Sequence, residues 1–171
     1  MTIDQIKAMN KPIALIGMMG VGKTHVGKVL AKRLGYEFID TDQTIEQDQG
    51  RFITQIFAQQ GEAAFRQMEL AAITKALQAP NTVIATGGGC IKTPAIRKAF
   101  AQSALTCWLQ ATPEQIFNRI KDDTTRPLLQ TENPLQTLRP TVRAPTLLQR
   151  RTYPCHNRIK KCGYGRGWYY K

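Results

Sequence analysis

The sequence has no long hydrophobic run and few cysteines, and both shortages narrow the class of protein. No apolar segment among its 171 residues reaches the ~18 residues that a membrane-spanning helix needs, so we expect no membrane partner. The amino-terminal stretch MTIDQIKAMNKP has no apolar run behind a basic start, and we expect no secretory signal. The four cysteines form no Cys-x-x-Cys pair, so the expected setting is the reducing cytoplasm.

Acidic residues are absent from residue 139 onward. Residues 1–138 carry 15 Lys and Arg and all 12 Asp and Glu, whereas residues 139–171 carry nine Lys and Arg. The net charge of +12 therefore belongs mostly to the tail. Because a charge block at one terminus is more often solvated than structured, we expect no nucleic-acid partner except through this tail. The chain divides into one domain, 1–138, and an irregular basic tail, 139–171.

Short apolar runs alternate with amphipathic segments through the first domain. Strands separated by helix-length segments predict an α/β fold whose parallel sheet is covered on both faces. Ligands of such sheets bind beyond the carboxyl ends of the strands, so the residues after each strand are the candidates for chemistry. In chain order, the predicted elements are strand 13–18, helix 23–34, strand 36–42, helices 44–49, 52–60 and 61–78, strand 82–86, helix 94–101, strand 105–110 and helix 113–121.

The stretch GMMGVGKT, residues 17–24, joins the first predicted strand to a helix. It matches G-x-x-x-x-G-K-[ST] at every fixed position and in the structural context that the motif needs. In such a loop, backbone N–H groups surround the phosphates of a nucleotide at the positive end of the helix. Lys23 would reach the β- and γ-phosphates, and the Thr24 hydroxyl would bind Mg²⁺. The flanking elements favour this interpretation over a chance match.

The second strand ends in Asp40 and Asp42, which are two residues apart and would share one face of an extended segment. Carboxylates beside a phosphate site act through Mg²⁺ or serve as a base for an attacking hydroxyl. The alternative is helix capping, with Asp42 or Thr44 as the N-cap of the next helix. The spacing alone does not decide between the two.

Three glycines, Gly87, Gly88 and Gly89, follow the third strand and therefore face the same crevice as the phosphate loop. Backbone without Cβ atoms lets a ligand approach main-chain N–H groups. A tight turn would need only one glycine, so three favour a ligand held against the chain. Arg66 and Glu69 precede them on a helix, three residues apart, and by themselves are more typical of a surface ion pair than of a site.

A polar, proline-broken segment at about 122–134 holds Arg126, and Arg119 lies just upstream. Over a phosphate site, such a segment would be a mobile lid that brings a cation to the transferring phosphoryl group. A plain surface loop explains the composition equally well.

Taken together, GMMGVGKT, FIDTDQTIE, GEAAFRQMELAAI, VIATGGG and RPLL follow one another as in shikimate kinases, and residues 13 to about 138 resemble that family. The resemblance implies a three-layer α/β/α fold of the P-loop nucleoside-monophosphate-kinase type, with five parallel strands and a lid. It implies a kinase that, with Mg²⁺, transfers the γ-phosphate of ATP to the 3-hydroxyl of shikimate on the pathway to chorismate and the aromatic amino acids. We expect a cytoplasmic monomer.

The resemblance also assigns residues. Asp40 would lie near the metal bound by Thr24, and Asp42 would bind substrate hydroxyls and take the proton. Arg66, oriented by Glu69, would bind the substrate carboxylate. The main chain at Gly87, Gly88 and Gly89 would contact the substrate, and Lys23, Asp42 and Arg126 would be catalytic. The expected ATP contacts are Gly20, Val21, Gly22, Lys23, Thr24, His25, Arg119 over the adenine and Arg126 on the phosphates.

The tail departs from the family's pattern, which continues with a second substrate-binding arginine, a fifth strand and a closing helix. Here the chain has three prolines, three glycines and no sustained hydrophobic period. Arg143 is the nearest match to that arginine, but it lies two residues too close to Arg126. The fifth strand is therefore in doubt, and we expect impaired activity. A shifted reading frame or a replaced terminus is one hypothesis for the change.

Two other functions stay open at this point. One is a P-loop nucleotide-binding module whose basic, aromatic tail binds nucleic acid through phosphate contacts and stacking. The other is a kinase of a different small hydroxylated acid. Zinc binding by Cys155, His156 and Cys162 is disfavoured because their spacing matches no common site.

Overall fold

The computed structural model describes residues 2–120 and the backbone of residues 152–156. The predicted lid with Arg126, Arg143 and most of the basic tail lie outside the described residues.

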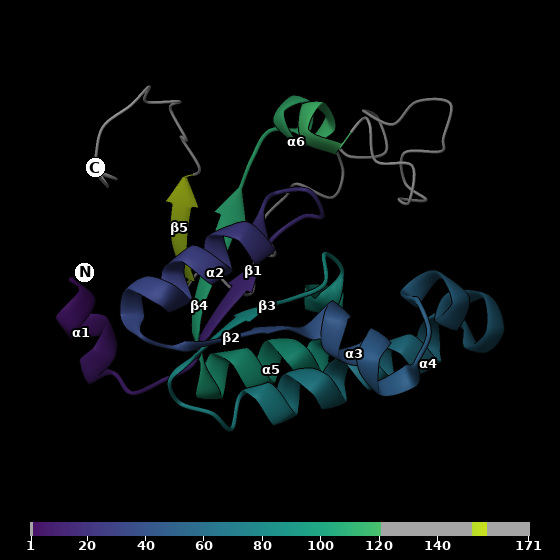
Figure 1. Cartoon of the computed structure of the whole chain (residues 1–171), viewed down its shortest axis with the longest axis horizontal. Helices are drawn as coiled ribbons and strands as arrows, with labels where there is room; N and C mark the ends of the chain where they lie inside the picture. Colours follow the sequence, from purple (N-terminus) through teal and green to yellow (C-terminus); the bar gives the residue numbers. More distant parts are fainter. Residues whose placement is uncertain (1, 121–151, 157–171) are drawn as a thin grey trace.

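A parallel sheet forms the centre of the fold (Figure 1). The strand order is β2-β3-β1-β4-β5, and every neighbouring pair is parallel. β1 and β3 are buried at every position, as expected of central strands that are covered on both faces. The predicted α/β fold is therefore confirmed. The strands are β1 Ile13–Ile16, β2 Glu37–Asp40, β3 Thr82–Ala85, β4 Leu105–Gln110 and β5 Thr152–His156.

The strand β5, which the sequence left in doubt, pairs with β4 from Thr152 opposite Thr106 to His156 opposite Gln110. It ends the strand order, so among the described strands it is an edge. An edge position tolerates Pro154, which has no backbone N–H to donate. The doubt arose because a short edge strand that contains a proline carries no alternating hydrophobic pattern.

Helices cover both faces of the sheet, α2 on one side and α4 and α5 on the other (Figure 1). Alternate residues of β1 point to opposite faces. Ile13 and Leu15 pack with Ala31 and Leu34 of α2, whereas Ala14 and Ile16 pack in a second cluster that includes Ile73 of α4 and Phe100 of α5. The helices are α1 Ile3–Ala8, α2 Lys23–Leu34, α3 Thr41–Gln49, α4 Ile53–Ala76, α5 Pro94–Ser103 and α6 Pro113–Ile120, with a 3₁₀ turn η1 at Cys90–Lys92.

The helices differ from the prediction chiefly in three places. The helix α1 was missed because its six residues are too few to show a sustained helical period. The two helices predicted at 52–60 and 61–78 form one element, α4, interrupted at Gly61, whose φ of 80° and ψ of 173° are not helical. The helix α3 begins at Thr41, three residues earlier than predicted. Within the described part of the chain, we find no helix with the length and hydropathy to cross a membrane.

Candidate active site

The phosphate loop joins β1 to α2, as the motif predicts. Gly17, Gly20 and Gly22 have φ values of 145°, 73° and 101°, a region that disfavours other residues. Lys23 is only 8% exposed, and its Nζ donates hydrogen bonds to the carbonyl oxygens of Gly17 at 2.8 Å and Met18 at 3.0 Å. Gly22 is the N-cap of α2 and has no side chain to cap it. The amino-terminal end of α2 therefore has the form of an anion site.

Three more residues that the sequence assigns to ATP, Val21, His25 and Arg119, lie in or beside this loop. Val21 is fully buried, and its carbonyl oxygen accepts a hydrogen bond from Nη1 of Arg119 at 3.0 Å. This contact holds the last turn of α6 against the phosphate loop. His25 lies exposed in the first turn of α2.

Thr24 and Asp40 meet directly, since the Thr24 hydroxyl donates to Asp40 Oδ2 at 2.8 Å. The other oxygen of Asp40 accepts from the backbone N–H groups of Asp42 at 3.2 Å and Gln43 at 3.5 Å, so Asp40 is the N-cap of α3. The predicted caps, Asp42 and Thr44, are wrong; Thr44 instead donates its hydroxyl to the carbonyl oxygen of Asp40 at 2.9 Å. The prediction that Asp40 and Asp42 share one face of an extended segment is also wrong, because Asp42 lies in the first turn of α3.

Asp42 and Glu69 bring two buried carboxylates together at the end of β3. A Cβ atom on Gly87 would lie 2.6 Å from Glu69 Oε1 and 2.9 Å from Asp42 Oδ1. Both of these oxygens are buried and have no hydrogen-bond partner among the described residues. Burial raises the pKa of Asp42 to about 6, with the charges of Asp40 and Glu69 acting in the same direction and Lys23 opposing them. Buried polar atoms are nearly always hydrogen-bonded, so this pair points to a ligand that donates.

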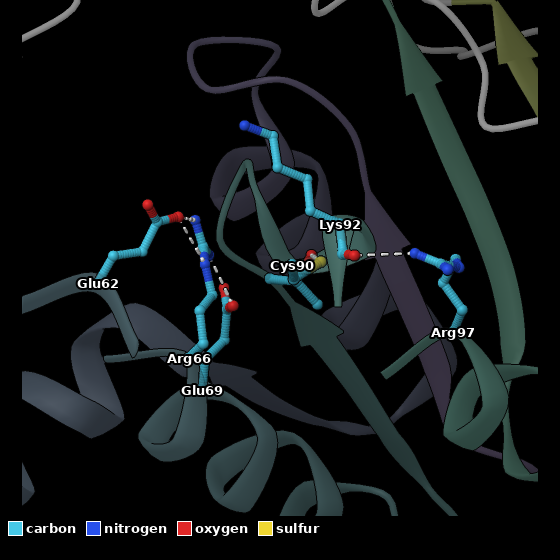
Figure 2. A network of polar contacts seen from close by, with 7 residues as sticks. Glu62, Arg66, Glu69, Cys90, Lys92 and Arg97 are labelled. Atoms are coloured by element: carbon cyan, nitrogen blue, oxygen red, sulfur yellow. Dashed lines mark hydrogen bonds and ion pairs between the residues drawn. The ribbon is translucent and has the colours of Figure 1, made fainter. Parts of the chain in front are cut away.

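Arg66 lies between two carboxylates of its own helix (Figure 2). Its Nη1 donates to Glu69 Oε2 at 2.8 Å, and its Nη2 and Nε donate to Glu62 Oε1 at 2.9 and 3.2 Å. The Glu69 side chain is completely buried, so this is not the surface ion pair that the residues alone favoured. Burial raises the pKa of Glu69, and the hydrogen bond from Arg66 opposes that rise.

Each glycine of the triplet faces a different neighbour. Gly87 faces the two carboxylates, a Cβ on Gly88 would lie 2.8 Å from the backbone N of Met19, and one on Gly89 would lie 2.7 Å from Arg66 Nη2. None of the three has a positive φ. The triplet is therefore explained by close approach. It contacts both the phosphate loop and the middle of α4, where Arg66 and Glu69 lie.

Glu62, Thr86 and Cys90 were not singled out from the sequence. The Thr86 hydroxyl donates to the carbonyl oxygen of Leu15 at 2.9 Å and accepts from the Cys90 thiol at 3.2 Å. Burial raises the pKa of that thiol to about 12. The sequence could have indicated the contact between Glu62 and Arg66, because residues four apart on a helix are neighbours.

A separate pocket lies between α3 and the start of α4 and holds none of the predicted site residues. Its lining residues are Gln43, Glu46, Gln47, Gly50, Arg51, Phe52 and Gln55.

The fold and the loop after β1 define the class, an α/β P-loop protein with a cluster of two carboxylates and an arginine beside that loop. The chain belongs to the shikimate kinase family: the family model described as "Shikimate kinase" matches residues 19–158. It is 43% identical over 129 residues to a shikimate kinase of Symbiobacterium thermophilum, covering 74% of each chain. It is 40% identical over 152 residues to that of Thermodesulfovibrio yellowstonii, covering 89% of this chain and 84% of the relative.

A solved structure agrees with these relatives. The shikimate kinase of Acinetobacter baumannii in complex with shikimate superposes with a TM-score of 0.73 at 39% identity, covering 85% of this chain and 79% of that one.

Proposed function

We propose that this chain transfers the γ-phosphate of ATP to the 3-hydroxyl of shikimate, giving shikimate 3-phosphate and ADP on the route to the aromatic amino acids. The observation that carries the proposal is the buried, unpartnered pair of oxygens on Asp42 and Glu69, beside Arg66 and the phosphate loop. Family membership supports the same reaction. We further infer that the protein acts as a monomer in the cytoplasm.

Shikimate is a small carboxylate with several hydroxyl groups, and the cluster of Asp42, Glu69 and Arg66 offers a complement to each. Arg66 would take the substrate carboxylate, because a guanidinium binds a carboxylate through two parallel N–H groups. Asp42 Oδ1, which needs a donor, would accept from a substrate hydroxyl. Main-chain groups of Gly87, Gly88 and Gly89 would complete the contact. Arg143, the expected second arginine, stays a prediction.

Asp42 has the properties of a general base. A carboxylate whose pKa is raised to about 6 is still ionised at neutral pH and is a better proton acceptor than an ordinary aspartate. In the proposed step, the 3-hydroxyl oxygen forms a bond to the γ-phosphorus, the bond from that phosphorus to the β–γ bridging oxygen breaks, and ADP leaves. The hydroxyl proton passes to Asp42.

On the nucleotide side, residues 20–25 would hold the phosphates of ATP, with Arg119 over the adenine. Lys23 would turn from the carbonyl oxygens of Gly17 and Met18 toward the β- and γ-phosphates. Arg126 would add a cation from the lid.

The Thr24 hydroxyl and the Asp40 carboxylate, whose oxygens already converge at 2.8 Å, are the hard donors that Mg²⁺ prefers, so the donor set fits this ion. When bound, Mg²⁺ neutralises charge on the phosphate oxygens. Thr24 would hold it, with Asp40 beside it.

A coupled ADP-release assay tests the function, run at low salt with and without shikimate. We expect ADP release that needs both shikimate and Mg²⁺. Quinate and gluconate serve as alternative hydroxylated acids. ATP consumption that is the same with and without shikimate would contradict the proposal.

A further inference from the structure

All three nitrogens of the Arg66 guanidinium are engaged by carboxylates of α4 (Figure 2). The edge formed by Nε and Nη2 is one that binds an incoming carboxylate through two hydrogen bonds. Here a single oxygen of Glu62 accepts from both atoms, at 3.2 and 2.9 Å. Glu62 therefore occupies a position that suits the carboxylate of a ligand.

The two partners of Arg66 differ in how firmly they are held. The Glu69 side chain is 0% exposed, whereas the Glu62 side chain is 63% exposed. A buried, hydrogen-bonded carboxylate cannot leave without stranding a charge. An exposed ion pair contributes little and can open into water. Glu69 is thus the fixed partner that orients Arg66, and Glu62 is the partner that a ligand can displace.

The backbone around Glu62 supports this division. Glu62 directly follows Gly61, the residue that interrupts α4, and so begins the helical segment that carries Arg66. A glutamate in a first helical turn is also favoured by the helix dipole. That effect explains a negative charge at this position, but it does not require the carboxylate to accept from both Nε and Nη2 of Arg66.

We propose that Glu62 sets the affinity for the substrate by competing, within the chain, for the carboxylate-binding edge of Arg66. The inference rests on the proposed function. The incoming carboxylate displaces Glu62 into solvent, while Glu69 keeps the guanidinium in place. Glu62 is therefore a specificity-determining residue that acts through Arg66 and takes no part in phosphoryl transfer.

Calorimetric titration of shikimate into the whole chain without ATP, for wild type and Glu62→Gln, tests the competition directly. Because an exposed ion pair is lost, we expect binding about two- to five-fold tighter in the variant. The KM for shikimate should fall by the same factor with kcat unchanged. A neutral carboxamide analogue of shikimate should bind both proteins equally, since it does not compete for the guanidinium edge as an anion.

Two further variants separate competition from charge. Glu62→Asp keeps the negative charge at the helix start but shortens the side chain, so it should also bind shikimate more tightly. Glu37→Gln removes the same charge from an exposed position on β2, and its affinity should match wild type. Tighter binding by both Glu62 variants supports the proposal.

Unchanged or weaker shikimate binding by Glu62→Gln, in a chain whose wild type binds and phosphorylates shikimate, overturns this inference and leaves the proposed function standing. Equal tightening in Glu37→Gln overturns it as well, because net charge would then be the cause. A wild-type chain that binds no shikimate overturns both.

Discussion

The two sides of the site differ in how their polar groups are satisfied. On the phosphate side, Lys23 donates to loop carbonyl oxygens, and Thr24 donates to Asp40, whose second oxygen caps α3. On the substrate side, Asp42 Oδ1 and Glu69 Oε1 are buried without partners among the described residues. The phosphate side must therefore exchange internal hydrogen bonds for ligand contacts. The substrate side holds an unfavourable arrangement, which under the proposed function a hydroxylated ligand would relieve; unsatisfied groups of this kind are common at functional sites.

The largest expected effect comes from Asp42→Asn. The amide cannot accept the substrate proton, so kcat should fall by about 10²–10⁴-fold. The same change removes a buried charge that lies beside Asp40 and Glu69, so the free energy of unfolding should increase. Steady-state kinetics and urea unfolding of the same preparation measure both. A variant that is both inactive and less stable would contradict the contrast between the two sides.

The next largest effect is expected from Gly87→Ala, which tests how closely the backbone approaches the carboxylates of the substrate side. Its Cβ would lie 2.6 Å from Glu69 Oε1 and 2.9 Å from Asp42 Oδ1. The Glu69 side chain is completely buried and bonded to Arg66, so it has little room to shift. Overpacking of this kind costs about 1–3 kcal/mol of stability. In the matched variant Gly89→Ala the Cβ meets the end of the Arg66 side chain at 2.7 Å, so we expect less loss of stability and a larger rise in KM for shikimate. Equal stability losses would contradict the expected difference between the carboxylate neighbours of Gly87 and the arginine neighbour of Gly89.

These contacts mark the limit of what the sequence predicts. The phosphate loop and the buried strands are local patterns, and both were confirmed. The pairing of Arg66 with Glu69 could also be predicted from the sequence, since the two residues lie three apart on a helix. The complete burial of Glu69 was not, because it depends on the approach of Gly87 from another part of the chain. The N-cap of α3 was misassigned for a related reason. Asp40, Asp42 and Thr44 are all suitable capping residues, and the contact with Thr24 fixes Asp40 in that role.

The pH dependence of stability gives a smaller effect. Asp42 has an ordinary pKa of 3.8 and a pKa of about 6 in the folded chain, so the folded form binds its proton more tightly than the unfolded form. Its contribution to stability is present below the ordinary value and is lost as the pH rises through about 6. Unfolding of wild type and Asp42→Asn in Mg²⁺-free buffer should show a stability advantage of the variant that grows between pH 4 and 8. A constant difference would mean that Asp42 titrates normally.

The smallest expected effect concerns the link between the two sides. Thr86 directly follows β3 and leads into the glycine triplet. Its hydroxyl donates at 2.9 Å to the carbonyl oxygen of Leu15, just before the phosphate loop. Thr86→Val keeps the shape and the backbone bond from Thr86 N to the same oxygen, so it should cost only about 1 kcal/mol. The KM for shikimate should rise slightly, because the triplet is held less firmly against β1. Thr86→Ser retains the hydroxyl and should restore the wild-type KM even where it loses some packing. If Thr86→Ser raises KM as much as Thr86→Val does, the hydroxyl does not couple the two sides.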